Sequence, residues 1–141
     1  MSEIWQLSAT ELAQRIAQRD LSSTEVMKAH LARIEAVNPA LNAIVRVLAD
    51  EARSAAELAD RRLASGEKIG PLHGVPFTVK ENIDMAGLPT TWGVPALAQA
   101  VVPADAPVVE RMRAAGAIQL AAPICCPTWP CAYTPLARYT G

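Results

Sequence analysis

No long hydrophobic run occurs in the 141 residues, although 51% of them are apolar. A membrane-spanning helix needs about 18 consecutive apolar residues, so the sequence predicts no membrane partner. The N-terminal stretch MSEIWQLSATELAQR has acidic residues and early helix signals where a signal peptide would have a basic start and an apolar segment. We therefore expect a cytoplasmic protein.

Neither sign of charge is in excess, because 13 basic residues stand against 14 acidic ones for a formal net charge of −1. A strong net charge is what attracts nucleic acid or an anionic membrane, so no nucleic-acid partner is expected. The length suits one domain or part of a larger one with a moderate core, and the oligomeric state is left open.

Cysteine and histidine are scarce. The three cysteines, Cys125, Cys126 and Cys131, lie close together, and an odd number without a secretory signal argues against a disulfide framework. Their spacing is not that of a zinc site, so no metal and no cofactor are predicted. Of the two histidines, His30 is expected at the surface or edge of a helix and His73 is expected to make loop hydrogen bonds.

Two helix starts are marked in succession near the N-terminus. Residues 8–11 (SATE) and 22–25 (SSTE) both have the pattern of a capping box, in which serine and glutamate satisfy each other's backbone amides. The second helix is expected to end at Asn38-Pro39, since the residue before proline disfavours helical geometry. Its buried face should carry Met27, Leu31 and Ile34.

The middle of the chain alternates between strand and helix signals. Residues 42–48 are β-branched and predict a strand or a lead-in to the next helix, whereas residues 49–66 are alanine-rich and predict a helix ended by Gly66. Residues 75–80 predict a strand. Asp105 is expected to cap a helix that reaches Gly116, with Pro107 in its first turn.

The segment AIQL, residues 117–120, then predicts another buried strand. Strand, helix and strand between residues 75 and 120 indicate an α/β fold behind a helical N-terminal layer.

Lys80 ends the predicted strand at residues 75–80. Val75, Phe77 and Val79 should share one face, and Lys80 should lie on the other. Taken alone, such a lysine is most simply a solvated strand end, because lysine is rarely buried without a partner. The alternative is an ammonium group held in an active site.

The sequence around this lysine resembles the amidase signature family, the serine hydrolases that cleave amide C–N bonds. The resemblance covers about residues 7–120 and rests on three segments in order: ARIEAVNPALNAIV, GPLHGVPFTVKENIDMAGLPTTWG and ADAPVVERMRAAGA. Glu81 stands where aspartate is more usual, and Val94 where serine often follows the glycine. The resemblance implies the N-terminal part of the amidase signature fold, namely a helical layer followed by the first strands of a mixed sheet with flanking helices.

The resemblance also implies a mechanism. Lys80 would be the base of a Ser-cisSer-Lys relay that activates a nucleophilic serine, with a small-molecule amide as substrate of the full-length protein. A lysine acts as a base only when it is neutral, and burial can lower its pKa. Asn82 and Asp84, which follow Lys80, are expected to make turn hydrogen bonds and to give some support in orienting the lysine.

The chain departs from the family where the serines should follow. No serine occurs after Ser65, so both partner serines of the relay are absent, and this chain alone is expected to be inactive. Residues 121–141 differ in composition from the rest, with all the cysteines and no acidic residue. We expect residues 1–120 to be the N-terminal part of an amidase signature domain and residues 121–141 to be an anomalous tail, for which reading out of frame from the Ala122 codon is our hypothesis.

Without the later part of the sheet, the face of Val75, Phe77 and Val79 is expected to lack cover, which predicts a marginal fold. Three functions stay open at this point. They are a hydrolytic amidase, the related A subunit of a glutamine amidotransferase for charged tRNA, and a non-catalytic fragment that serves as an interaction module.

Overall fold

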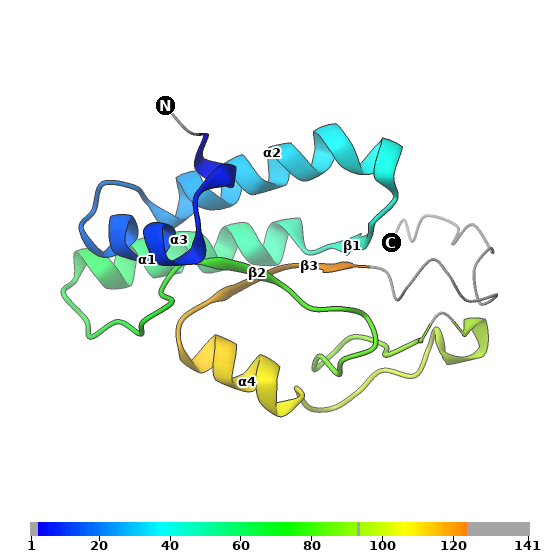
Figure 1. Ribbon diagram of the computed structural model, residues 1–141. Helices are drawn as coiled ribbons and strands as arrows, with labels where there is room; N and C mark the ends of the chain where they lie inside the picture. Colours follow the sequence, from blue (N-terminus) through cyan, green and yellow to red (C-terminus); the bar gives the residue numbers. More distant parts are fainter. Residues whose placement is uncertain (1–2, 93, 124–141) are drawn as a thin grey trace.

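The computed structural model describes residues 3–92 and 94–123, and the cysteines and most of the anomalous tail lie outside them. A small mixed sheet separates helices on its two sides (Figure 1). The elements in chain order are η1 (Ile4–Gln6), α1 (Ala9–Ala17), α2 (Ser23–Leu41), β1 (Ile44–Val47), α3 (Ala49–Ala64), β2 (Pro76–Thr78), η2 (Pro95–Leu97), α4 (Pro107–Ala114) and β3 (Ile118–Pro123).

Both predicted capping boxes are confirmed. At the start of α1, Ser8 N donates to Glu11 Oε2 over 2.9 Å and Glu11 N donates to Ser8 Oγ over 3.2 Å. The same pair of bonds joins Ser22 and Glu25 at the start of α2, at 2.9 and 3.0 Å. Hydrogen bonds from Ser8 and Ser22 hold the pKa of each glutamate below its ordinary value.

The predicted end of the second helix is wrong. Helix α2 continues through Pro39 to Leu41 and ends at Asn42, which has a left-handed backbone with φ of 49°. The Asn38 side chain explains the exit, because its Oδ1 accepts from the amides of Ala43 and Ile44 at 3.0 and 2.9 Å. These bonds stabilise the turn into β1, and they compensate for the unfavourable position before proline.

The sheet has the order β1-β3-β2. Strand β1 is antiparallel to β3, whereas β2 is parallel to β3 and connected to it through α4. Residues 42–48 thus contain a strand, and the predicted strand–helix–strand unit is confirmed. Helices α2 and α3 lie on one side of the sheet and α4 lies on the other (Figure 1).

The strand predicted at residues 75–80 is shorter, because β2 spans Pro76–Thr78. Single backbone bonds nevertheless extend the pairing with β3: Val79 N donates to Ala121 O and Glu81 N to Pro123 O, both over 3.1 Å. The alternation of faces is retained, since Val79 and Glu81 are buried whereas Thr78 and Lys80 are exposed.

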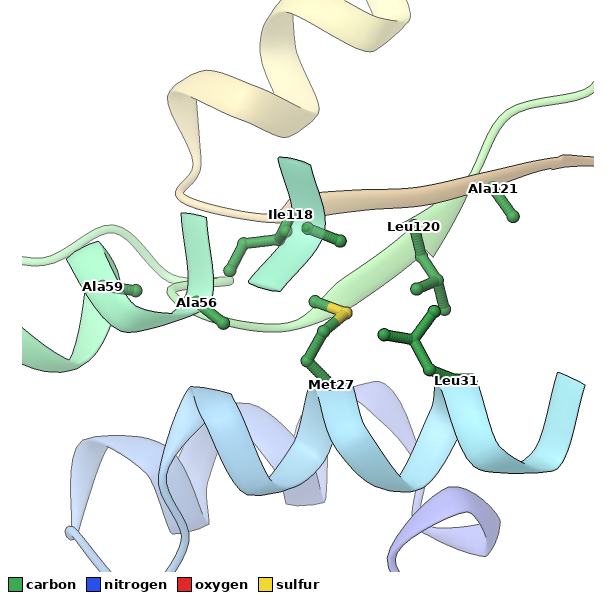
Figure 2. Close-up of a cluster of buried hydrophobic side chains, with 8 residues drawn as sticks. Met27, Leu31, Ala56, Ala59, Ile118, Leu120 and Ala121 are labelled. Atoms are coloured by element: carbon green, nitrogen blue, oxygen red, sulfur yellow. The ribbon is translucent and has the colours of Figure 1, made fainter. Parts of the chain in front are cut away.

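Three apolar clusters form the core. The first joins α2 and α3 to β3 and includes Met27 and Leu31, as predicted, packed on Ile118 and Leu120 (Figure 2). The second lies between α1, the start of α2 and Val75, and the third surrounds Val79 and Val109.

The expectation that the face of Val75 and Val79 lacks cover is wrong for these two residues. Val75 is 3% exposed and Val79 is 5% exposed, whereas Phe77 is half-buried. The cover comes from α1 and α2 at one end and from Met85 and α4 at the other. Segments within the described residues therefore bury most of a face that we expected later sequence to cover.

The predicted cap of α4 is also wrong. Ala106 is the N-cap residue of α4, and Pro107 is in its first turn as expected. Asp105 instead accepts from Ala86 N over 2.7 Å and forms an ion pair of 3.1 Å with Arg113 Nε. It thereby ties the loop that follows Lys80 to the last turn of α4.

Candidate active site

Lys80 lies just beyond β2, at the carboxyl edge of the parallel pair β2 and β3. The bonds of Val79 and Glu81 to β3 hold its backbone on both sides, and Ile83 N donates to Lys80 O over 2.9 Å in a tight turn. Ligand sites of open α/β sheets lie at this edge. The backbone that carries the amine is therefore fixed at the edge of the sheet where ligand sites usually lie.

The Lys80 side chain is exposed. We expected the apolar strand to bury Lys80. The described part of the chain does not bury it. The reason is the alternation of the strand: Val79 and Glu81 point into the core, so Lys80 points away from it.

Asp84 bonds to residues beyond the turn that follows Lys80. Its Oδ1 accepts from Thr90 Oγ1 over 2.7 Å, and its backbone oxygen accepts from Ala106 N over 2.9 Å. The half-buried Asn82 differs, because its Oδ1 is buried and makes no hydrogen bond within the described part of the chain. Neither the Asp84 carboxylate nor the Asn82 oxygen makes a hydrogen bond within the turn itself among the described residues.

Glu81 is the residue whose position the sequence reasoning missed. Its side chain is buried, at 8% exposed, and its Oε2 accepts from Thr91 Oγ1 over 2.6 Å. The available signal was the alternation itself, which places residue 81 on the same inward side as Val79. An acidic residue at an inward position is uncommon and indicates a specific contact.

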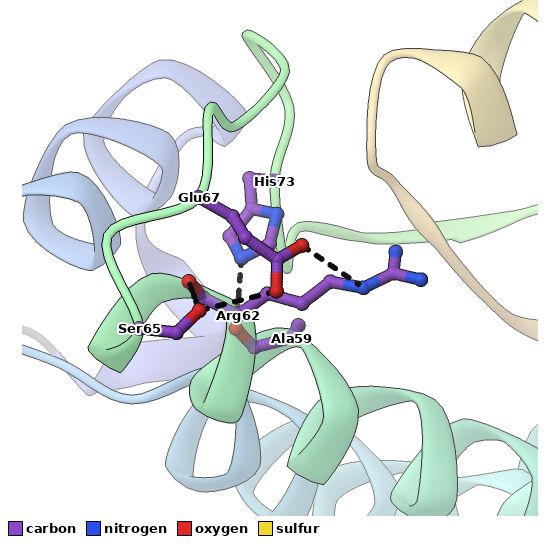
Figure 3. Close-up of polar contacts among 5 residues, drawn as sticks. All are labelled: Ala59, Arg62, Ser65, Glu67 and His73. Atoms are coloured by element: carbon purple, nitrogen blue, oxygen red, sulfur yellow. Dashed lines mark hydrogen bonds and ion pairs between the residues drawn. The ribbon is translucent and has the colours of Figure 1, made fainter.

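Both histidines contact backbone carbonyl groups. His73 is buried in the loop before β2, and its Nε2 lies 3.0 Å from Ala59 O. Figure 3 shows this contact between the loop and α3. His30 is half-buried on α2, with Nδ1 2.8 Å from Val26 O. Both predicted structural roles are confirmed.

Figure 3 also shows Ser65 and Glu67 at the end of α3, where Ser65 Oγ donates to Arg62 O over 2.8 Å.

Away from Lys80, the described residues form a groove but no cluster of metal ligands. Among residues 3–92 and 94–123, no group of three or more His, Cys, Asp or Glu side chains could hold a metal ion, and no helix is long and apolar enough to cross a membrane. A groove of about 720 Å³ lies between the end of α2, β1 and the start of α3. Its lining contains none of the three candidate site residues.

Comparisons with known proteins agree on one family. The family model described as Amidase matches residues 25–122, which include β2, Lys80 and all of β3 except Pro123. This chain belongs to the amidase signature family. An indoleacetamide hydrolase of Bradyrhizobium diazoefficiens is 49% identical over 115 residues, covering 82% of this chain and 22% of that protein.

Two other similar proteins cover the same region. The A subunit of the glutamyl-tRNA(Gln) amidotransferase of Acidothermus cellulolyticus is 47% identical over 120 residues, covering 85% of this chain and 24% of that protein. A solved bacterial aryl acylamidase of the family is 30% identical with a TM-score of 0.80, over 86% of this chain and 26% of that one. The chain therefore spans about a quarter of the length of the relatives it matches, and the predicted α/β fold class is confirmed.

Proposed function

We propose that this chain is the N-terminal part of an amide-cleaving enzyme in which Lys80 is the base of a Ser-cisSer-Lys relay. The observation that carries the proposal is the position of Lys80 at the carboxyl edge of β2 and β3, with its backbone bonded on both sides. A rigid element holds a reacting group more precisely than a loop does. The amine could thus accept a proton at a constant place.

The chemistry requires partners from outside this chain. A serine hydroxyl is a weak nucleophile and needs an adjacent base, and in the proposed relay the second serine passes the proton to the lysine. Because no serine follows Ser65, we propose that the 141-residue chain does not hydrolyse amides by itself. Sequence that carries the serines would also cover the exposed Lys80.

Asn82 and Asp84 support the lysine in this proposal. Asp84 closes the loop that follows Lys80 through Thr90 and Ala106. The buried Asn82 Oδ1 is available to a donor from the same covering sequence. The substrate of the full-length protein would be a small-molecule amide, with no cofactor and no nucleic-acid or membrane partner, in the cytoplasm.

The gene sequence provides the first test. We expect the bases beyond codon 120, read in the alternative frame, to encode a family-like continuation followed by a Ser- and Gly-rich stretch. Absence of such a stretch from all three frames would contradict the frame hypothesis for residues 121–141.

An activity measurement provides the second test. We expect no ammonia release from a panel of primary amides by the 141-residue chain, and release by the product of the continued frame. Lys80→Met in that longer product should lower kcat at least about 10³-fold, since members of such relays act as a unit. Lys28→Met, on the exposed side of α2, is the control and should leave kcat unchanged. Full activity of the Lys80→Met protein would refute the role of Lys80.

The similarity to the A subunit of an amidotransferase favours one second candidate, an enzyme that releases ammonia from glutamine for transfer to a charged tRNA. The two functions differ in their substrate. Glutamine hydrolysis that depends on charged tRNA and partner subunits would support the amidotransferase, and hydrolysis of simple amides by the protein alone would support the amidase.

A further inference from the structure

Glu81 lies directly after Lys80 and is bound at both its backbone and its side chain. Its amide donates to Pro123 O at the end of β3, over 3.1 Å. Glu81 as a whole is 8% exposed, on the side of the strand opposite Lys80, and its carboxyl group accepts from Thr91 Oγ1 over 2.6 Å. A contact of this residue therefore acts on the backbone that carries the lysine.

Thr91 belongs to the loop between β2 and α4. The base of this loop is closed by Gly87 N to Val102 O at 3.0 Å and by Val102 N to Leu88 O at 3.1 Å. The Glu81–Thr91 bond joins the far part of the loop to the carboxyl edge of the sheet. The loop and the lysine edge are thus held in one arrangement.

Burying the Glu81 carboxyl group at this contact opposes folding. Removing such a group from water opposes folding unless hydrogen bonds compensate, and an apolar residue beside Val79 and Met85 would avoid that cost. A local rule that is broken beside a proposed catalytic group indicates a functional reason.

We propose that Glu81 is a positioning residue, which sets the direction of Lys80 by binding Thr91. The proposal rests on the proposed function of Lys80. Without this bond, the loop that contains Thr91 is less constrained. The Glu81 side chain then no longer helps to fix the turn from Lys80 to Ile83. The lysine amine would then sample several positions in place of one.

The test uses the 141-residue chain and a probe on the lysine itself. The sequence has three lysines, Lys28, Lys68 and Lys80, so reductive methylation with ¹³C-formaldehyde gives few dimethylamine signals, and Lys80→Arg identifies the one from Lys80. The other two lysines are internal controls. Amide exchange of Gly87 and Val102 reports on the base of the loop in the same samples.

Three variants separate position from charge. Thr91→Val removes the hydroxyl and leaves the Glu81 carboxyl in place, Thr91→Ser keeps a hydroxyl, and Glu81→Gln replaces the acid by an amide of the same shape. We expect Thr91→Val to move the Lys80 signal and to speed amide exchange of Val102 by roughly tenfold, as expected for a local opening made easier. Glu81→Gln keeps an oxygen that accepts from Thr91, so it should change both readouts much less. Thr91→Ser should resemble the parent.

Three results would overturn the proposal. An unchanged Lys80 signal in Thr91→Val would show that the contact does not act on the lysine. A change in Glu81→Gln alone would assign the effect to charge. Equal changes at all three lysines would assign Glu81 to the stability of the whole fold. None of these readouts requires amide hydrolysis, so failure of the proposed function, seen as an active Lys80→Met enzyme, is distinguished from failure of this inference.

Discussion

At the scale of single residues, the close approach of Ser23 and Gly74 is a tight constraint on substitution. Ser23 is 0% exposed, and its hydroxyl makes no hydrogen bond within the described residues. Gly74 has φ of +74°, and a Cβ there would overlap Ser23 Oγ and lie 2.9 Å from Ser23 Cβ. The loop before β2 can therefore pass α2 only with glycine at this position.

We predict that Gly74→Ala lowers the free energy of unfolding by about 2–4 kcal/mol, the sum of overpacking and left-handed backbone strain. Gly87→Ala is the matched control, because Gly87 has φ of +80° but nothing within 4 Å of its added Cβ. It should cost only about 1 kcal/mol. Urea unfolding followed by circular dichroism measures both, and equal losses would contradict the packing argument.

The contact between Ser23 and Gly74 leads to a second prediction. Ser23→Ala removes a buried hydroxyl without a partner, so it should leave stability unchanged or raise it by up to about 1 kcal/mol. In that background Gly74→Ala should cost less than in the parent, because the overlapping oxygen is gone. A large loss in Ser23→Ala would mean that the hydroxyl has a partner in solution.

At the scale of elements, the two capping boxes make the N-terminal helices sensitive to acid. Each glutamate has a folded pKa below its ordinary value of 4.5, with hydrogen bonds from Ser8 or Ser22 as the first cause. Because the folded pKa is lowered, this stabilisation is present above the unfolded pKa. It is lost as the pH falls below 4.5 and through the folded value.

We predict that Ser8→Ala and Ser22→Ala each lower the free energy of unfolding by about 1 kcal/mol at pH 7, the usual effect of losing a helix cap. The difference from the parent should shrink at pH 3, since the contacts that need an ionised glutamate are already lost there. Ser54→Ala, at an exposed interior position of α3, is the control and should not destabilise. A loss independent of pH would contradict the role of the glutamates.

At the scale of the whole molecule, the described residues form a sheet with two edges. Strand β1 pairs only with β3 in this sheet, and its last residue, Val47, is 40% exposed. Four further exposed apolar residues lie in the loop after Lys80: Trp92, Val94, Leu97 and Val101. An open strand edge and exposed apolar residues each favour association of chains.

We predict that Val47→Lys slows aggregation of the 141-residue chain several-fold, because a charge on an edge strand opposes pairing with another strand. Leu58→Lys is the matched control, since Leu58 is 42% exposed but lies on α3. Light scattering at constant protein concentration measures the two rates. Equal slowing by both variants would assign the effect to net charge.

The features predicted correctly from the sequence depend on contacts within a few residues. The capping boxes join residues three apart, and the buried stripe of α2 follows from helical spacing. Apart from the end of α2, the errors involve partners farther along the chain. Asp105 binds Ala86 and Arg113 and does not cap the start of α4, and Glu81 is held by Thr91, ten residues away.

The sequence by itself determined where the N-terminal helices begin, the strand–helix–strand order, and the place of Lys80 after an apolar strand. These follow because local hydrogen bonds and the alternation of side chains need no distant partner. Only the tertiary structure decided that Val75 and Val79 are covered, that Glu81 binds Thr91, and that Asp105 binds Ala86 and Arg113. The reason is that burial depends on which segments pack together, and packing is a property of the whole arrangement and not of any one segment.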